Sequence, residues 1–373
     1  MTHALAEQSF NPTDASTSFA LPSEYYTSPD IYATELERVF ARSWNFACHA
    51  SQVAEPGQYV RCHAGEEEIF VVRDKAGRLH GYYNVCMHRA HTLVQEDSGR
   101  IDLITCPYHA WTYALDGKLK VARNCENARG FRKENFGLNE IKVEEFCSFI
   151  WVNLEPTAAP LSQQAIGLEA LLMKHCPDLP KLKFAHRLSW DINANWKTVI
   201  DNFTECYHCA TAHPAFVDLV NMKDYALNTH DIWSVHIGPP GAPEKAPYVY
   251  STTDERPTDY IAAFLWPNVT IWIMPGSGNI SMLYMLPTGP ETCREHFDFY
   301  FMNETPSKEE WDSIVYLRDV LQPEDITLCE RVQKGLRSRS YRTGRLVVDA
   351  RRSGISEHAT HHFQSLVHRA HHG

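Results

Sequence analysis

Two short cysteine–histidine pairs constrain this chain more than any other feature of its sequence. One residue separates Cys86 from His88, two separate Cys106 from His109, and seventeen residues lie between the pairs. Each pair offers a thiolate and an imidazole, so the four side chains form a metal-ligand set only if a compact scaffold brings both loops together. The flanking segments predict such a scaffold, because EEEIFVVRD and RLHGYYNVC read as strands on either side of a turn at 75–77.

The four residues fit an iron–sulfur cluster better than a zinc ion. Two cysteines on one iron and two histidines on the other give the mixed ligation that raises the reduction potential of a [2Fe-2S] cluster above that of four-cysteine ferredoxins. A structural Cys2His2 zinc site is the alternative, but the Cys-Pro-Tyr-His-x-Trp context of the second pair favours the cluster. We therefore predict that Cys86, His88, Cys106 and His109 bind a [2Fe-2S] cluster. His91 is interpreted as a neighbouring or surface residue.

A second candidate metal site lies in the segment ANWKTVIDNFTECYHCATAHPAF. Glu205 and His208 are three residues apart and share one face of a helix expected around 195–208. His213 is five residues further on, so the helix must loosen before the imidazoles can converge. Asp325, near the start of a later helix, is the best third ligand. Two histidines and one carboxylate leave three positions of an octahedral iron(II) open for oxygen and substrate, although two ordinary histidines are the alternative.

Other cysteines and histidines are interpreted as structural. Cys206 and Cys209 bracket His208 and are expected to have packing roles. The chain has eleven cysteines, an odd number, which favours reduced thiols and metal ligands over a disulfide framework. The histidine-rich end, HATHHFQSLVHRAHHG, lacks a clear ligand spacing and is expected to be a solvated or partly tag-like tail.

Composition excludes several classes of partner. The formal net charge is −11, from 46 acidic and 35 basic residues, which argues against nucleic-acid binding. The longest apolar stretch, YIAAFLWPNVTIWIM, is interrupted by Pro267 and Asn268, so it predicts buried strands and no membrane span. No secretory signal is recognised, and we expect a cytoplasmic protein.

The order of patterns along the chain predicts an α+β protein. We expect a lead-in over residues 1–43, a β-rich domain over 44–155 and a larger domain of helices and strands over 156–373. In the last domain, Ser307-x-x-Glu310 predicts a capping box at a helix start, and Pro323 predicts the first turn of another helix.

Taken together, the two sites resemble those of the oxygenase (α) subunits of Rieske non-haem iron oxygenases. The resemblance covers nearly the whole chain. It implies that the lead-in packs on a catalytic domain of the helix-grip type, an antiparallel sheet with helices, and that a Rieske domain carries the cluster. It also implies a homotrimer that receives electrons from NAD(P)H through a separate flavin- or iron–sulfur-containing reductase. Glu205 would then relay electrons between His109 of one subunit and His208 of the next, at a position where the family more often carries Asp.

Within that family, several stretches are most similar to carnitine monooxygenase and related oxygenases acting on quaternary ammonium compounds: ITCPYHAWTYALDGKL, ARNCEN, DNFTECYHC, QPED with ERVQKGLRSRSYR, and RSGISEH. Met87 and Ala90 replace the Pro and Gly that are commoner there. Phe203 stands where close relatives often have Tyr. The resemblance implies hydroxylation of a C–H bond next to nitrogen, followed by N-demethylation or C–N cleavage.

Aromatic faces bind trimethylammonium groups through cation–π attraction. The candidate substrate-binding residues are Phe203, Phe264, Trp266 and Tyr284, with ordinary core packing as the alternative for each.

Two other functions compete. An aromatic-ring hydroxylase or O-demethylase of the same architecture would line its pocket with apolar residues. A Rieske electron carrier without catalysis would leave His208, His213 and Asp325 without a role, and would hold two irons per chain where an oxygenase holds three.

Overall fold

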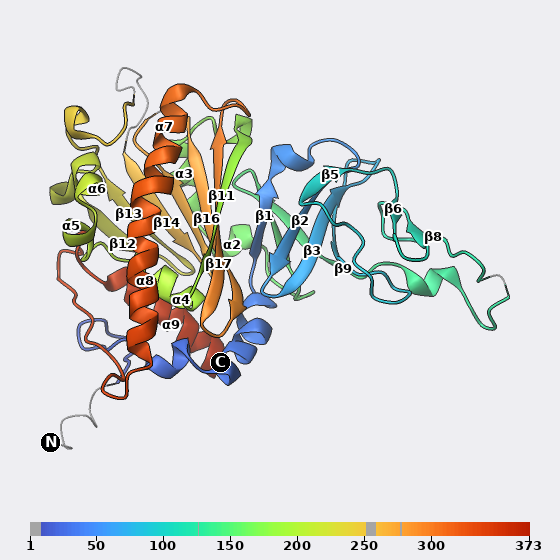
Figure 1. Ribbon diagram of the computed structural model, residues 1–373, viewed down its shortest axis with the longest axis horizontal. Coiled ribbons are helices and arrows are strands. Elements are labelled where there is room, and N and C mark those ends of the chain that lie inside the picture. Colours follow the sequence, from blue (N-terminus) through green and yellow to red (C-terminus); the bar gives the residue numbers. More distant parts are fainter. Residues whose placement is uncertain (1–8, 126, 251–258, 277) are drawn as a thin grey trace. The chain divides into compact units, whose positions relative to one another are not determined.

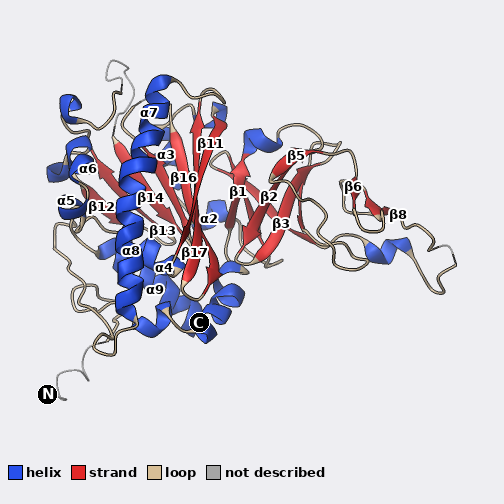
Figure 2. Cartoon of the chain, viewed as in Figure 1, coloured by secondary structure: helices blue, strands red, loops and turns tan. Residues whose placement is uncertain are grey.

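The structure, a computed structural model, describes residues 9–125, 127–250, 259–276 and 278–373. The chain divides into two compact units (Figures 1 and 2). One comprises Phe40–Leu161; the other comprises the residues up to Val39 together with Ser162–Gly373. Antiparallel sheets dominate both units and helices are concentrated in the second, so the α+β fold class expected from the sequence is confirmed.

The unit Phe40–Leu161 is built on β-strands. A seven-stranded sheet has the order β1-β10-β9-β4-β3-β2-β5, and a small separate sheet has the order β6-β7-β8. The bounds are β1 (Asn45–His49), β2 (Gln58–Ala64), β3 (Glu67–Arg73), β4 (Leu79–Tyr83), β5 (Ser98–Arg100), β6 (Ile104–Thr105), β7 (Thr112–Tyr113), β8 (Leu119–Val121), β9 (Glu140–Phe146) and β10 (Phe149–Asn153). Strands β3 and β4 form the hairpin predicted around 75–77.

The two cysteine–histidine loops follow β4 and β6. Buried Cys86 and Cys106 belong to a core cluster with Tyr82, Trp111 and Tyr113. Because the two loops share this core, the small unit holds both in fixed positions at its edge.

The other unit contains one antiparallel sheet of order β11-β17-β16-β15-β14-β13-β12. The central strands β14 and β15 are buried at every position, because both faces are covered. The apolar stretch interrupted by Pro267 and Asn268 forms these two strands. The bounds are β11 (Lys183–Ile192), β12 (Ala226–Thr229), β13 (Trp233–Gly238), β14 (Tyr260–Leu265), β15 (Val269–Ile273), β16 (Ile280–Gly289) and β17 (Thr292–Phe301).

Helices cover this sheet, and Figure 1 shows α8 lying across its strands. The α-helices are α1 (Pro29–Glu35), α2 (Leu161–Gln164), α3 (Leu168–His175), α4 (Trp196–Phe203), α5 (Cys209–Ala212), α6 (Pro214–Leu219), α7 (Lys308–Tyr316), α8 (Gln322–Leu336) and α9 (His358–His372). The 3-10 helices are η1 (Ser23–Tyr26), η3 (Ala50–Val53), η4 (Lys133–Phe136), η5 (Leu179–Lys181), η6 (Met222–Asp224) and η7 (Pro243–Lys245), and η2 (Leu36–Phe40) is a π-helix.

Helices α7 and α8 are joined by η8 (Leu317–Leu321), a π-helical segment. The capping box predicted at Ser307 and Glu310 opens α7, and Pro323 lies in the first turn of α8, as predicted. A proline has no backbone N–H to donate, and a π-helical turn just before it accommodates the lost hydrogen bond.

The histidine-rich C-terminus is a packed helix, so the expectation of a solvated tail was wrong. Helix α9 buries Phe363, Leu366 and Val367. The error arose because its apolar residues recur at helical spacing but are diluted by histidines. The side chain of Gln364 accepts a hydrogen bond from the backbone N–H of Leu21, which ties the N-terminal segment to α9.

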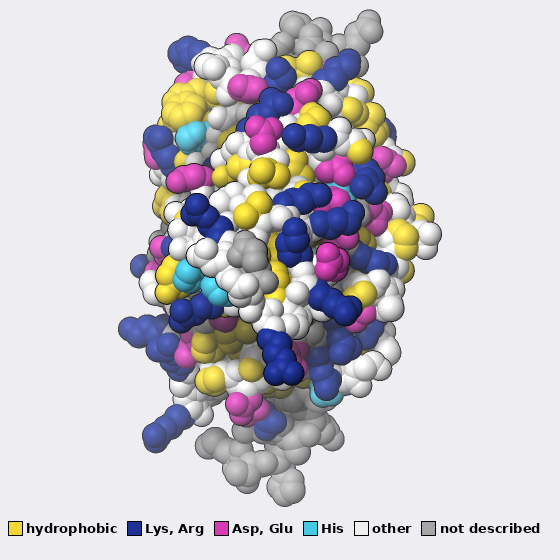
Figure 3. Space-filling view, turned by 90° about the vertical axis from the view of Figure 1, so that its right-hand side faces the viewer, with side chains coloured by type: hydrophobic (Ala, Val, Ile, Leu, Met, Phe, Trp, Pro, Cys, Tyr) yellow, Lys and Arg dark blue, Asp and Glu magenta, His cyan; other side chains and the backbone are white. Residues whose placement is uncertain are grey.

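The folded chain shows neither a one-sided charge on the face in Figure 3 nor, in its described part, a membrane-spanning helix. Lys and Arg side chains are spread over the face seen in Figure 3 and are interspersed with acidic ones, so the negative net charge is not gathered there. Among the described residues, no helix combines the length and apolar character needed to cross a membrane.

Candidate metal centres and the adjoining pocket

The chain around Glu205 leaves helical geometry earlier than the sequence suggested. Helix α4 begins after Asn195, whose side chain accepts from the N–H of Lys197, and ends at Phe203. The helix expected around 195–208 therefore stops before Glu205. His208 precedes α5, and His213 lies between α5 and α6, immediately before Pro214. The break before Pro214 allows two histidines five residues apart to face one point.

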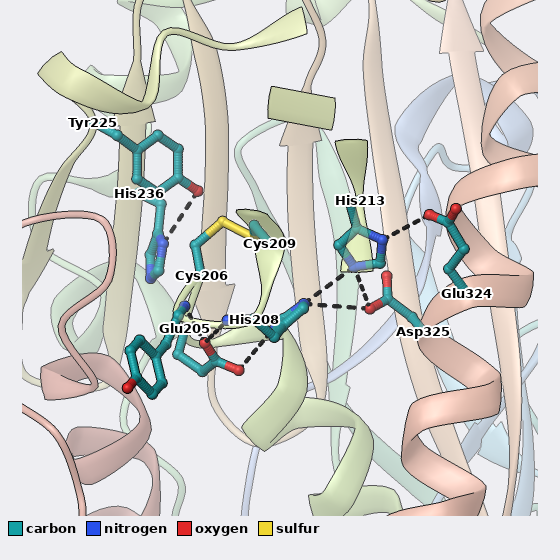
Figure 4. The surroundings of a disulfide bond; sticks show 10 residues. Glu205, Cys206, His208, Cys209, His213, Tyr225, His236, Glu324 and Asp325 are labelled. Atoms are coloured by element: carbon teal, nitrogen blue, oxygen red, sulfur yellow. Dashed lines mark hydrogen bonds and ion pairs between the residues drawn. A yellow bond between two sulfur atoms is a disulfide. The ribbon is translucent and has the colours of Figure 1, made fainter. Parts of the chain in front are cut away.

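His208, His213 and Asp325 converge on that point (Figure 4). The Nε2 atoms of the two histidines are 3.1 Å apart, and Oδ1 of Asp325 lies 2.9 Å from Nε2 of His213 and 3.5 Å from Nε2 of His208. Ligands at right angles on a metal ion with bonds of about 2.1 Å are about 3 Å apart. Three donors with these spacings fit three adjacent positions of one octahedral ion.

Two further carboxylates orient the histidines. Glu205 Oε1 lies 2.5 Å from Nδ1 of His208, and Glu324 Oε2 lies 2.7 Å from Nδ1 of His213. A hydrogen bond from Nδ1–H to a carboxylate fixes the tautomer in which Nε2 is free to bind a metal. Sequence reasoning missed Glu324, although its place beside Asp325 in the first turn of α8 was a usable signal.

The electrostatics of this cluster favour a positive charge. Burial opposes the charged form of His208, but hydrogen bonds with Asp325 and Glu205 raise its pKa to about 10. Burial likewise opposes the charged form of Asp325, yet His208 and His213 lower its pKa. Three carboxylates around two imidazoles thus stabilise a cation at their centre.

Cys206 and Cys209 are buried, as the expected packing roles require, but the structure also joins them through a disulfide bond that was not predicted from the sequence. The reason is the early end of α4. The two residues lie where the chain turns, and their Cα atoms are 4.9 Å apart, within the range that a disulfide spans. The bond closes a short loop around His208 (Figure 4).

A pocket adjoins the histidines and Asp325. Five aromatic side chains line it: Phe203, Phe216, Tyr225, Tyr260 and Trp272. Their rings form a continuous wall, since Trp272 is 5.2 Å from Phe203 and 6.0 Å from Tyr260, and Tyr260 is 5.2 Å from Phe216. No Lys or Arg occurs among the described residues that line the pocket.

Of the aromatic residues suggested by the sequence, the structure places only Phe203 in the lining of this pocket. Phe264 shares a strand face with Ala262 but packs against Phe363 of α9, and so does Trp266. Tyr284 follows Leu283, which lines the pocket, so strand alternation turns Tyr284 to the opposite face. There it contacts His296.

The two cysteine–histidine loops have the same backbone arrangement. The N–H of Cys86 donates to the carbonyl of His91 and the N–H of Cys106 to that of Trp111, at 2.9 and 2.8 Å. In each loop the residue four positions after the cysteine adopts a left-handed conformation, with φ of 54° at Ala90 and 56° at Ala110. Glycine adopts this conformation without steric cost, which explains why Gly is the commoner residue in the first loop.

The loops bury the cysteines, whereas His88 is exposed and His109 is half-buried. Cys86 and Cys106 are 2% exposed, whereas His88 lies at the surface and its ring is 4.6 Å from that of His109. Trp111 stacks on His88 at 4.8 Å. The hydroxyl of Tyr113 lies 3.3 Å from Sγ of Cys86, and burial raises the pKa of Tyr113, so its O–H remains available to donate.

This arrangement fits a two-iron cluster better than zinc. Among the described residues, only the group of His208, His213 and Asp325 brings three donor atoms within 4.8 Å of one another. In the loops, the thiol of Cys106 contacts that of Cys86 and the ring of His88 lies 4.6 Å from that of His109, which gives a thiol pair and an imidazole pair. A tetrahedral zinc ion needs all four donors at one point. One pair per iron is the ligation of a Rieske cluster. His91 lies outside these pairs and contacts the carbonyl of Thr92.

Comparison with known proteins matches both regions of the chain. Residues 43–137 match the Rieske [2Fe-2S] domain, and residues 179–372 match the catalytic domain of the ring-hydroxylating alpha subunit. The carnitine monooxygenase oxygenase subunit of Acinetobacter baumannii is 39% identical over 352 residues, which cover 94% of each chain. The chloroplastic choline monooxygenase of Beta vulgaris is 32% identical and matches 96% of this chain and 77% of its own length.

A solved structure extends the likeness to three dimensions. The quaternary ammonium Rieske monooxygenase CntA in complex with L-carnitine superimposes with a TM-score of 0.88 and 36% identity. The match covers 97% of this chain and 99% of that chain.

Proposed function

Because this chain belongs to the Rieske non-haem iron oxygenases as an oxygenase subunit, we propose that it hydroxylates a C–H bond next to the nitrogen of a quaternary ammonium compound. The enzyme is a Rieske monooxygenase, and its cofactors are a [2Fe-2S] cluster and a mononuclear iron. The family and cofactors expected from the sequence are thereby confirmed. The observation that supports the substrate class is an aromatic pocket without Lys or Arg in its described lining, beside three converging metal ligands.

Two sets of donor side chains are assigned as metal ligands. We propose that Cys86, His88, Cys106 and His109 hold the cluster and that His208, His213 and Asp325 hold the iron, within functional regions 44–155 and 156–373 and with residues 1–43 supporting the latter. When bound, the cluster supplies single electrons and the iron activates dioxygen. The carboxylates of Glu205 and Glu324 each face Nδ1 of one histidine, so that the neutral imidazole would present Nε2 to the metal.

Substrate binding follows from the pocket's chemistry. A trimethylammonium group has no N–H to donate, so it is bound by aromatic faces and by charge. The rings of Phe203, Trp272 and Tyr260 supply such faces next to the ligands. Hydroxylation consumes one dioxygen molecule, two electrons and two protons: one oxygen atom enters the C–H bond and the other is released as water. The hydroxylated carbon then releases nitrogen, giving either formaldehyde and a demethylated amine or trimethylamine and a carbonyl compound.

An oxygenase subunit depends on a separate reductase, here proposed to be a flavin and iron–sulfur protein that takes electrons from NAD(P)H in the cytoplasm. We further propose a homotrimer in which Glu205 lies between His208 of its own chain and His109 of the neighbouring subunit. The short contact of Glu205 with His208 supports this role. Sedimentation of the purified protein tests the assembly, and a monomer at working concentration contradicts it.

The activity is tested by a single turnover. The loaded, reduced protein is mixed with oxygen and carnitine, γ-butyrobetaine, glycine betaine, choline or benzoate, and the products are analysed by mass spectrometry. Trimethylamine or formaldehyde from an ammonium substrate supports the proposal and identifies the broken bond. Oxidation of benzoate alone contradicts the substrate class and favours an aromatic-ring hydroxylase.

A further inference from the structure

Glu295 places a carboxylate in the wall of the pocket without an internal partner. It lies on β17, is 1% exposed and lines the same pocket as Trp272 and Asp325. Its Oε1 atom has no hydrogen-bond partner among the described residues. Burying a carboxylate without such a partner is costly, so buried acids in proteins are nearly always paired or hydrogen-bonded. This one departs from that rule in the lining of the pocket beside His208 and His213.

The other carboxylates that line the pocket are already engaged. Glu205 contacts His208, and Asp325 contacts both His208 and His213. The described lining contains no Lys or Arg, and its two histidines are held by other carboxylates: His208 by Glu205, and His213 by Asp325 and Glu324. Among the described residues, no contact pairs either histidine with Glu295.

The groups around Glu295 add no positive charge either. Asp325 and Cys329 of α8 and Cys293 of β17 are in electrostatic contact with it. Burial raises the pKa of both thiols, so they stay uncharged. These three groups therefore supply no cation that could pair with Glu295.

We infer that Glu295 is the counter-ion for the ammonium group of the substrate, and that it makes the enzyme prefer cationic substrates over uncharged molecules of the same shape. This inference rests on the proposed function. A quaternary ammonium group has no hydrogen to donate, so the attraction acts through charge, and it is strong because the pocket is poorly solvated. The aromatic wall contacts the methyl groups, and the carboxylate of Glu295 attracts the positive charge on nitrogen.

The experiment separates shape from charge. γ-Butyrobetaine and 5,5-dimethylhexanoate differ only in the replacement of the nitrogen by carbon. Calorimetric titration of the metal-loaded protein should give a Kd for the ammonium compound lower by about tenfold or more, a gap of about 1.4 kcal/mol. Glu295→Gln, which keeps the shape, should reduce this gap to about threefold or less. Glu295→Asp, which keeps the charge, is the matched control and should retain most of the preference.

If Glu295→Gln keeps the full preference, the inference is wrong while the proposed function stands. If the wild-type protein binds no quaternary ammonium compound, the proposed function fails, and the inference falls with it.

Discussion

The carboxylate of Glu324 lies 2.7 Å from Nδ1 of His213, although 111 positions separate the two residues in the chain. Helix α8 therefore contributes twice to one site, with Asp325 facing the converging Nε2 atoms and Glu324 holding the ring of His213 from behind. Partners of this kind commonly affect metal affinity as strongly as some direct ligands do.

Removing the Glu324 carboxylate should loosen the mononuclear iron. We expect Glu324→Ala to weaken retention of that iron by about 10- to 100-fold against a chelator, because His213 loses its orienting partner. Metal analysis after graded chelation measures this, while the visible spectrum follows the cluster, which should be unaffected. Glu330→Ala is the control, since Glu330 lies on the same helix but accepts hydrogen bonds from Asn193. Equal iron retention by both variants would contradict the role of Glu324.

Neutralising Glu205 should separate metal loading from turnover. Glu205→Gln keeps the length of the side chain and loses its charge, so we expect both metal centres to remain loaded and turnover to fall to near background. Glu205→Asp keeps the charge with one methylene less and should retain part of the activity. Stopped-flow spectra of the reduced cluster, mixed with substrate and oxygen, measure the step directly. Normal reoxidation in Glu205→Gln would refute the proposed electron relay.

Trp272 should contribute to binding, whereas Trp266 should not. Trp272 lies in the aromatic wall, so Trp272→Leu is expected to raise the Kd for γ-butyrobetaine by about tenfold through the loss of a cation–π face. Trp266→Leu makes the same change against Phe363, outside the pocket lining, and should leave that Kd unchanged. Calorimetric titration of both variants tests this, and a similar Kd for the two would mean that Trp272 only fills space.

Glu295 should make the substrate-free protein less stable as pH rises. A carboxyl group whose pKa is raised to about 8 in the fold keeps its proton there, while the unfolded chain releases it above its ordinary pKa of about 4.3. Between these values the folded state binds more protons, so the free energy of unfolding falls with pH, by at most about 1.4 kcal/mol per unit. Glu295→Gln should therefore raise Tm more at pH 8 than at pH 6. An equal change at both values would show that Glu295 ionises normally in the fold.

Local spacing allowed the sequence to predict the metal-ligand candidates. Each cysteine is only two or three residues from its histidine, in the pairs Cys86–His88 and Cys106–His109. The conformation of one short loop therefore positions both side chains of a pair. Asp325 is far from His208 in the chain. Its place near the start of a helix, just after Pro323, nevertheless identified it as the best candidate for the third metal ligand.

The pocket wall escaped prediction because it depends on strand pairing. Trp272, Leu283 and Glu295 come from three strands, and they share one face only because the register aligns them. Sequence alternation predicts that neighbours such as Leu283 and Tyr284 face opposite sides, but it does not say which side is covered by helices. Phe264 is an example. It lies on the same face of its strand as Ala262, which lines the pocket, but it packs against Phe363 of α9.

The π-helical segment Leu317–Leu321 has a consequence for the direction in which Asp325 points. Each residue of a regular α-helix advances the chain by about 100° around the axis, so one extra residue in a widened turn changes the phase of everything that follows. Asp325 comes directly after this phase change. Shortening the segment by one residue would leave the helix continuous but turn Asp325 away from the histidines. Helical phase, set several residues upstream, thus decides which carboxylate of α8 meets His208 and His213.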